Sequence, residues 1–118
     1  MGFEEEAVGH YEAALAGDLS DDELRSAFLG LGSTYRALGR DADSDRTFRQ
    51  GIERFPDFRP LRVFRALTAY NLGEPREAVA DMVRLLLETT SDEEILRYRR
   101  SLAAYAEDLD RSWLTPRP

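Results

Sequence analysis

The residues of this sequence that could do chemistry are few and widely spaced. A nucleophilic serine or cysteine needs a neighbouring base, and the chain has one histidine, His10, and no cysteine. His10 lies between a glycine and a tyrosine in a predicted helix, which favours an exposed or half-packed side chain over a catalytic one. Zinc and iron sites draw mainly on several histidines and cysteines. We therefore predict that the protein is not an enzyme and binds no cofactor or metal.

Carboxylates are the other groups that suggest chemistry. Dense acidic runs occur at residues 4–6, 18–23 and 92–94, and aspartates alternate over residues 41–45. The dense runs do not have the alternating oxygen ligands and central glycine of a calcium loop, and residues 41–45 begin a predicted helix. Acids in the first turn of a helix are favoured by the helix dipole. We interpret all four segments as helix starts rather than calcium ligands.

The charge pattern excludes one class of partner and suggests another. The net charge is −7, which argues against nucleic acid because phosphate contacts need a basic face. Residues 1–23 hold eight acids and no arginine, whereas residues 24–65 hold nine arginines against five acids. Arginine favours fork-like contacts with carboxylates. The asymmetry therefore predicts that the arginine-rich middle meets acidic groups, either of a partner or of this chain.

Length and composition predict one folded domain. The chain has 118 residues, 42% of them apolar and 33% charged, a balance that suits a strongly amphipathic helical protein rather than a disordered one. No run of 18 apolar residues occurs, so we expect no membrane-spanning segment. The sequence has no cysteine, which fits a cytoplasmic protein.

Helix signals recur along the chain and no segment alternates like a strand. Ser20 and Ser91 are each followed three residues later by glutamate, the pattern of a capping box. Gly39 and Gly73 stand where a helix ends and the chain reverses. Short links between helices predict antiparallel neighbours. The predicted helices are 3–16, 21–38, 41–54, 59–72, 75–89 and 92–111, followed by a frayed tail over residues 112–118.

A 34-residue internal repeat underlies this pattern. Shifting the sequence by 34 positions aligns Gly32 with Ala66, Gly39 with Gly73, Ser44 with Ala78, and Phe48 with Met82. Within the first copy the spacing is Phe28-x2-Leu31-Gly32-x2-Tyr35, then Ser44-x3-Phe48, then Pro56. This spacing resembles the tetratricopeptide repeat family, whose period is 34 residues. Small residues at 32 and 44 would let two helices approach closely, and the large apolar residues would fill the space between hairpins.

The resemblance implies a fold and a division of the chain. The fold is all-α, with antiparallel helix hairpins stacked in a right-handed α-solenoid and a C-terminal capping helix over 92–111. Residues 1–118 form a single tetratricopeptide domain, which comprises a half repeat at 3–16, an intact repeat at 25–58 and a looser repeat at 59–92. The segments 32–40 and 98–105 resemble small bacterial tetratricopeptide proteins of unknown biochemical role.

The resemblance also implies a protein-binding groove, because the first helix of each hairpin lines the concave side of such a stack. The groove residues so implied are Leu29, Ser33, Arg36, Val63, Leu67, Tyr70 and Asn71. Leu29 and Ser33 stand where the family's clamp for a peptide carboxylate has lysine and asparagine, which argues against that ligand. Two alternatives follow: the apolar strip holds an amphipathic segment of a partner protein or peptide, or the capping helix covers Val63 and Leu67.

Two function hypotheses remain at this point. The first is a non-enzymatic interaction module or scaffold that self-associates as a homodimer, because the half repeat would leave one side of helix 3–16 without its hairpin partner. The residues of that side are Phe3, Ala7 and Tyr11, with the acids of the same helix facing Arg46, Arg49, Arg54, Arg59 and Arg62. The second is a docking or regulatory fragment of a larger enzyme or regulator, whose preceding half repeat would lie before Met1.

Overall fold

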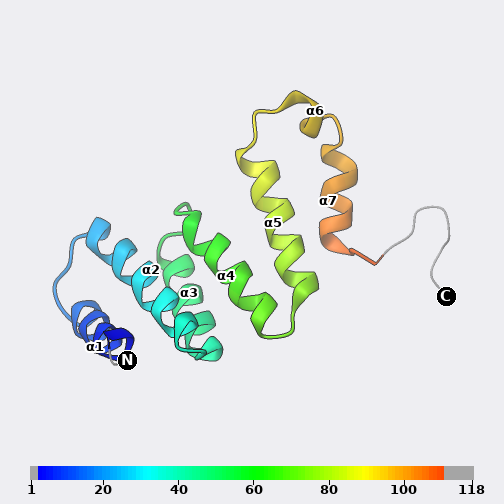
Figure 1. The fold of residues 1–118 in the computed structure, drawn as a ribbon. Coiled ribbons are helices and arrows are strands. Elements are labelled where there is room, and N and C mark those ends of the chain that lie inside the picture. The colour runs from blue at the N-terminus through cyan, green and yellow to red at the C-terminus, as the bar shows by residue number, and fades with distance from the viewer. Residues whose placement is uncertain (1–2, 111–118) are drawn as a thin grey trace.

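The computed structural model describes residues 3–110, and every regular element in that range is a helix (Figure 1). The all-α prediction is therefore confirmed. The helices are α1 (Phe3–Leu15), α2 (Asp21–Ala37), α3 (Asp41–Arg54), α4 (Pro60–Asn71), α5 (Pro75–Thr89), α6 (Glu93–Leu96) and α7 (Arg99–Glu107). The first five agree with the predicted ranges to within one residue at each end. The predicted tail at 112–118 lies outside the described residues.

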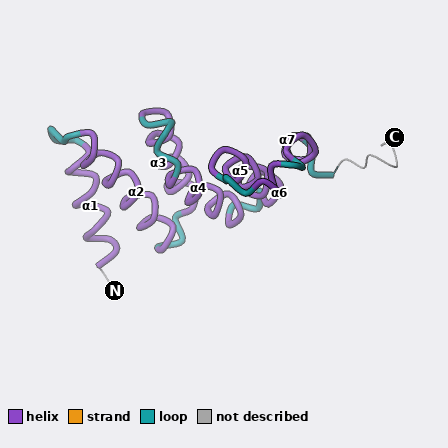
Figure 2. Tube along the Cα trace, turned by 90° about the horizontal axis from the view of Figure 1, so that it is seen from above, coloured by secondary structure: helices purple, strands orange, loops and turns teal. Residues whose placement is uncertain are grey.

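The helices form an elongated stack rather than a bundle. Each helix from α1 to α4 packs against the next one along the chain, and α7 packs against α5. Seen from above, they follow one another along the long axis of the molecule, whose extents are 52 × 29 × 21 Å (Figure 2). Within the described residues, helices contact their neighbours in the stack, and the first helix does not contact the last. This pattern is characteristic of a helical solenoid.

Local signals set the helix ends. The Ser20 hydroxyl accepts a hydrogen bond from the Glu23 amide at 3.3 Å, and the Glu23 carboxylate accepts one from the Ser20 amide at 3.2 Å. These bonds complete the predicted capping box, and the bond with Ser20 holds the pKa of Glu23 below its usual value. Gly39 and Gly73 take φ values of 76° and 79°, the left-handed conformation that ends a helix and is open mainly to glycine.

The last predicted helix is wrong in one respect, because the structure divides it. The chain is helical over α6, turns at Arg97 and Tyr98, and resumes as α7. The turn brings α7 back alongside α5 (Figure 1), where it buries Ala106. The packing of α7 on α5, with the hydrogen bond from Arg84 to the Ala106 carbonyl, compensates for the few backbone hydrogen bonds that an unbroken helix would add. At the turn, the Tyr98 side chain is left 60% exposed.

The second predicted capping box is also wrong. Asp92, rather than Ser91, is the N-cap of α6, and its carboxylate accepts hydrogen bonds from the amides of Glu94 and Ile95 at 2.9 and 3.0 Å. A short carboxylate side chain satisfies two otherwise unpaired amides of the first turn. The sequence contains both candidates side by side, and the charged one caps the helix because its bonds also gain from the helix dipole.

Phe48 lies at the centre of the core, as the repeat spacing predicts. Its side chain is completely buried and stacks on Phe64 of α4 with ring centroids 6.4 Å apart. A Cβ atom at Gly32 of α2 would overlap the Phe48 ring. The missing side chain at Gly32 therefore lets α2 and α3 approach and gives the ring its place, so that one residue joins three helices.

The N-terminal helix has its own contact with α2. Val8 of α1 is buried with Leu31 and Tyr35 of α2, and Tyr11 packs against this cluster. Burial raises the pKa of the Tyr35 phenol, and the nearby negative charge of Glu12 raises it further. Helix α1 is thus fixed to the stack by a small core of its own.

A buried hydroxyl pair joins α2, α3 and α4. Ser44 Oγ donates a hydrogen bond of 2.7 Å to the Gly32 carbonyl and lies 3.1 Å from Thr68 Oγ1. Both side chains are completely buried. Buried polar groups of this kind stabilise a fold only while each has its partner.

Ser44→Ala is expected to lower the free energy of unfolding by about 1 kcal/mol, the typical loss for one buried hydrogen bond. Because Thr68 Oγ1 would lose a partner, the double variant Ser44→Ala/Thr68→Val should lose less than the sum of the two single variants. Urea denaturation measures all three. Ser101→Ala removes an exposed hydroxyl from α7 and serves as the control. Strictly additive losses would contradict the coupling between Ser44 and Thr68.

Candidate interaction surface

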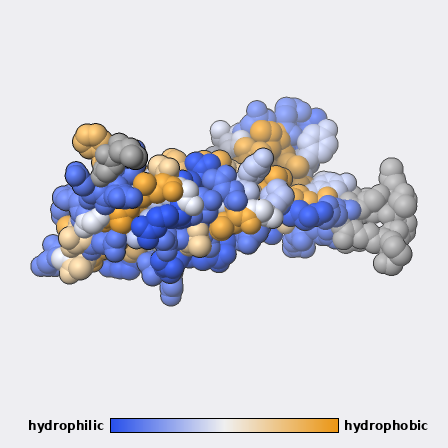
Figure 3. Space-filling view, turned by 60° about the horizontal axis from the view of Figure 1, so that its bottom comes forward, coloured by the Kyte–Doolittle hydropathy of each residue, from blue (hydrophilic) through white to orange (hydrophobic). Residues whose placement is uncertain are grey.

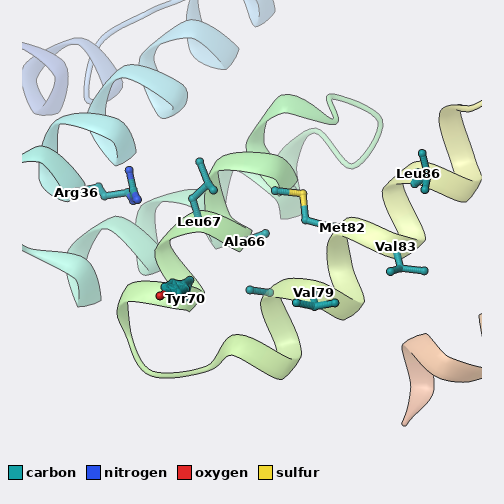
Figure 4. Close-up of a pocket in the computed structure, with 9 residues that line it drawn as sticks. Arg36, Ala66, Leu67, Tyr70, Val79, Met82, Val83 and Leu86 are labelled. Atoms are coloured by element: carbon teal, nitrogen blue, oxygen red, sulfur yellow. The ribbon is translucent and has the colours of Figure 1, made fainter. Parts of the chain in front are cut away.

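An apolar groove of about 400 Å³ opens between α4 and α5 and reaches the end of α2. Its lining residues are Arg36, Ala66, Leu67, Tyr70, Ala78, Val79, Met82, Val83 and Leu86. In the close-up, Leu67 and Tyr70 lie on the α4 side and Val79, Met82, Val83 and Leu86 on the α5 side (Figure 4). A concave, mostly apolar surface with one polar group is the usual form of a recognition site.

Small residues at the crossing of α4 and α5 create this groove. Ala66 and Ala69 of α4 are buried against Ala78 of α5, and Met82 packs on them. Alanines let the two backbones approach closely, so the longer side chains that follow stand along the edges of the crossing. Several of these longer side chains remain open to solvent, since Leu67 is 37% exposed and Val79 51% exposed. Apolar side chains also emerge in patches elsewhere on the mainly hydrophilic surface (Figure 3).

Arg36 is the one charged residue among those that line the groove. Its Nε atom is buried and has no hydrogen-bond partner, and no carboxylate of residues 3–110 forms an ion pair with its guanidinium. By contrast, Arg62 and Arg65 of α4 are both paired with carboxylates. Arg36 is therefore a positive charge at an apolar surface, and its guanidinium forms no ion pair with a carboxylate of residues 3–110.

The structure brings together only part of the residue set that the sequence predicts for the groove. Arg36, Leu67 and Tyr70 line it. Leu29, Ser33 and Val63 are half-buried and Asn71 is exposed, and none of these four lines the groove.

The residues that sequence reasoning missed lie mainly on α5, with Ala66 of α4 beside them. The missed α5 residues are Ala78, Val79, Met82, Val83 and Leu86. One signal could have found them. Helix α5 carries apolar runs at 78–80, 82–83 and 85–87, which is more than one buried face of a helix needs.

The comparison with known protein families agrees with this architecture. The family model for the tetratricopeptide repeat matches residues 1–109. The chain belongs to the tetratricopeptide repeat family. A comparison with curated proteins found no significant match.

In this tetratricopeptide protein the C-terminal helix leaves the groove open. Helix α7 packs on α5, where Ala80, Arg84 and Ala106 line the small space between the two helices. The Arg84 guanidinium donates a hydrogen bond of 2.9 Å to the Ala106 carbonyl. The alternative that the capping helix covers the apolar strip is therefore wrong for Leu67, which stays 37% exposed.

The arginine-rich middle of the tetratricopeptide stack is largely neutralised within the chain. Arg65 is only 11% exposed and contacts three carboxylates, with N···O distances of 3.0 Å to Asp45, 2.6 Å to Glu77 and 3.3 Å to Asp81. The hydrogen bond from Arg65 holds the pKa of Glu77 below its usual value. Four residues from three helices thus share one ion cluster.

Within one chain, the pairing of the middle arginines with the acids of α1 is wrong, because these arginines pair elsewhere. Arg59 and Arg62 contact Glu88 of α5, and the bond from Arg62 lowers the pKa of Glu88. The remaining pairs are Arg46 with Asp43, Arg49 with Asp45 and Glu77, and Arg54 with Asp21. Acids of the same helix or of a nearby helix meet these arginines, because neighbours in the stack are neighbours in sequence.

The histidine and the acidic segments that suggested chemistry make ordinary structural contacts. His10 is exposed and lies edge-on to the Tyr11 ring with centroids 6.0 Å apart. The carboxylate of Asp43 accepts hydrogen bonds from Arg46 and Arg40, which lower its pKa. Within residues 3–110 no group of three or more histidines, cysteines or acids is arranged to hold a metal ion. No helix in the same range is both long and apolar enough to cross a membrane.

Proposed function

We propose that this tetratricopeptide chain is a non-enzymatic interaction module that holds a segment of a partner protein in the α4–α5 groove. One observation carries the proposal: the groove is an apolar concavity that the chain's own last helix leaves open. Tetratricopeptide repeats generally mediate contacts between proteins, and a concave, mostly apolar surface is the usual form of a recognition site. The repeat boundaries at 25–58 and 59–92 belong to the same proposal, supported by helix ends at Ala37 and Asn71, 34 residues apart.

The proposal predicts that Leu67→Asp abolishes partner capture without unfolding the protein. A carboxylate in the groove would have to lose its water when an apolar segment binds. The matched control is Leu72→Asp, because Leu72 is 38% exposed, close to the 37% of Leu67, and does not line the groove. Wild type, Leu67→Asp and Leu72→Asp are each used for affinity capture from an extract of the native organism, followed by mass spectrometry. Wild type and Leu72→Asp should retain partner proteins that Leu67→Asp does not retain. Identical captures by all three would refute the groove as the binding surface.

Self-association as a homodimer is a second proposal, supported by α1. Phe3 is 79% exposed, and an exposed aromatic at the end of the stack is a typical contact residue. Ala7 is half-buried. Tyr11 belongs to the contact with α2 instead, because a Cβ atom at Gly30 would overlap its ring.

The dimer proposal predicts sedimentation as a two-fold dimer at micromolar concentration, weakened by Phe3→Ser. Because the middle arginines are already paired within the chain, the dimer should depend little on salt. A monomer at both low and high salt would defeat the proposal, and a dimer unaffected by Phe3→Ser would move the interface away from α1.

A further inference from the structure

The two complete hairpins of the stack differ in what covers them. In the α2–α3 hairpin, Ser44 and Phe48 are completely buried because α4 lies over them, through Thr68 and Phe64. A shift of 34 residues places Ala78 and Met82 of α5 at the corresponding positions. These two residues line the open groove. The surface that receives a helix in the first hairpin therefore receives none in the second.

Helix α7 does not fill the corresponding position. It packs along α5 through Ala106 and the residues around Ala80, and it leaves Tyr70 of α4 62% exposed. In the first hairpin, α4 contacts both α2 and α3. A helix equivalent to α4 would contact both α4 and α5, and α7 reaches only α5 to a substantial extent.

We propose that the groove is an acceptor site for one amphipathic helix of a partner protein, and that an acidic residue of this helix pairs with Arg36. The inference rests on the proposed function and specifies its partner. The wall on α5 is formed by positions 78, 79, 82, 83 and 86, which span about 12 Å at 1.5 Å per residue. A partner helix that contacts the wall over about two turns matches this length, with apolar residues at positions i, i+3 or i+4, and i+7.

Charge complementarity supplies the second half of the argument. The guanidinium of Arg36 lies at the edge of an apolar surface with a buried Nε and no carboxylate partner in residues 3–110. Binding of a wholly apolar helix would remove more water from this charge without replacing it. An aspartate or glutamate beside the apolar stripe of the partner would replace that water with a charge-assisted hydrogen bond.

A second copy of this chain is a poorer occupant. Its acidic helix is α1, and the exposed residues of that helix are mainly Glu4, Glu5, Glu6 and Glu12, with Phe3 as the one large apolar side chain among them. The groove presents a row of aliphatic side chains on α5 and needs several apolar partners. Helix α1 could satisfy Arg36 but would leave most of that row uncovered.

A library of single-helix peptides displayed on phage, with all surface positions randomised, tests the inference on the full-length protein. Selection against wild type should enrich peptides with an apolar i, i+3 or i+4, i+7 stripe and an adjacent aspartate or glutamate. The best peptide should lose about tenfold in affinity with Arg36→Gln, which corresponds to 1.4 kcal/mol. Selection against Arg36→Glu should enrich lysine or arginine in place of the acid. The control is Arg99→Glu, which makes the same charge change at an exposed residue of α7. This variant should select the same peptides as wild type.

The outcomes separate this inference from the proposed function. Some peptides could lose binding with Leu67→Asp and yet show no preference for an acidic residue, or bind as extended chains without a helical stripe. Either result would overturn the inference and leave the groove as a binding surface. Peptides that bind independently of Leu67→Asp would count against both. Self-association of wild type that Leu67→Asp abolishes would identify a second copy as the occupant and would also overturn the inference.

Discussion

Phe48→Ala should lower the free energy of unfolding by about 3–5 kcal/mol, the range for emptying an aromatic core position. The Phe48 ring is completely buried and packs between Gly32 of α2 and Phe64 of α4. Alanine would leave a cavity where three helices meet, and the stack can collapse only partly into it. Chemical denaturation followed by circular dichroism measures the loss. In a protein of ordinary stability, a loss of this size removes a large share of the total.

The control for Phe48→Ala is Phe3→Ala, which makes the same change at a position that is 79% exposed. Its effect on the free energy of unfolding should stay within about 0.5 kcal/mol. A loss below about 1 kcal/mol for Phe48→Ala would show that the ring is not part of the core and that the repeat register is wrong. Gly32→Ala provides a second check, since its methyl group would overlap the ring and should cost about 1–3 kcal/mol.

Arg65→Met should lower the free energy of unfolding at pH 7 by about 2–3 kcal/mol. Removal of one partner from a buried ion cluster costs about 3–5 kcal/mol, but Asp45 and Glu77 remain 18% and 40% exposed, so water screens part of the loss. Methionine retains the apolar stem and removes the charge. The three carboxylates would then keep only their contacts with Arg49 and Arg84.

Arg65→Met should also weaken the dependence of stability on pH that the wild type draws from Glu77. In the wild type, the bond with Arg65 lowers the folded pKa of Glu77, so this carboxylate stabilises the fold above its unfolded pKa of about 4.3. That contribution disappears as the pH falls through the folded pKa. In the variant, Arg49 still contacts Glu77, but without the bond from Arg65 the folded pKa of Glu77 lies closer to its unfolded value. The wild type therefore loses more stability than the variant as the pH falls from 7 toward about 4, and the difference between the two proteins should narrow.

Urea denaturation at pH 7 and at about pH 4.5 tests both parts of this prediction. The control is Arg46→Met, because Arg46 is 63% exposed and its ion pair with Asp43 lies at the surface. Its effect should stay below about 1 kcal/mol. A constant difference between wild type and Arg65→Met at the two pH values would mean that the three carboxylates do not share the charge of Arg65.

Much of the fold follows from signals that act within a few residues. The capping box at Ser20 and the left-handed glycines at 39 and 73 need only the chain that immediately flanks them, so the sequence alone locates these helix ends. The burial of Phe48 follows from the 34-residue spacing, because each repeat places the same position against the next hairpin.

The lining of the α4–α5 groove could be predicted from the sequence only in part. Arg36, Leu67 and Tyr70 lie on the helices that the family pattern directs toward the groove, and the structure places them there. The α5 wall was missed because a helix with two apolar faces does not show which face its neighbours will cover. That choice depends on where α7 packs, which no local pattern of residues determines.

The sequence by itself determined the helices, their order and the residues at the centre of the stack, because hydrophobic periodicity and end signals act locally and repeat every 34 residues. Only the tertiary structure decided the turn before α7, the enclosure of Arg65 by Asp45, Glu77 and Asp81, and the unpaired state of Arg36 in an open groove. Each of these features depends on which side chains from different helices come into contact. Those contacts are set by the packing of the whole chain and not by any local pattern of residues.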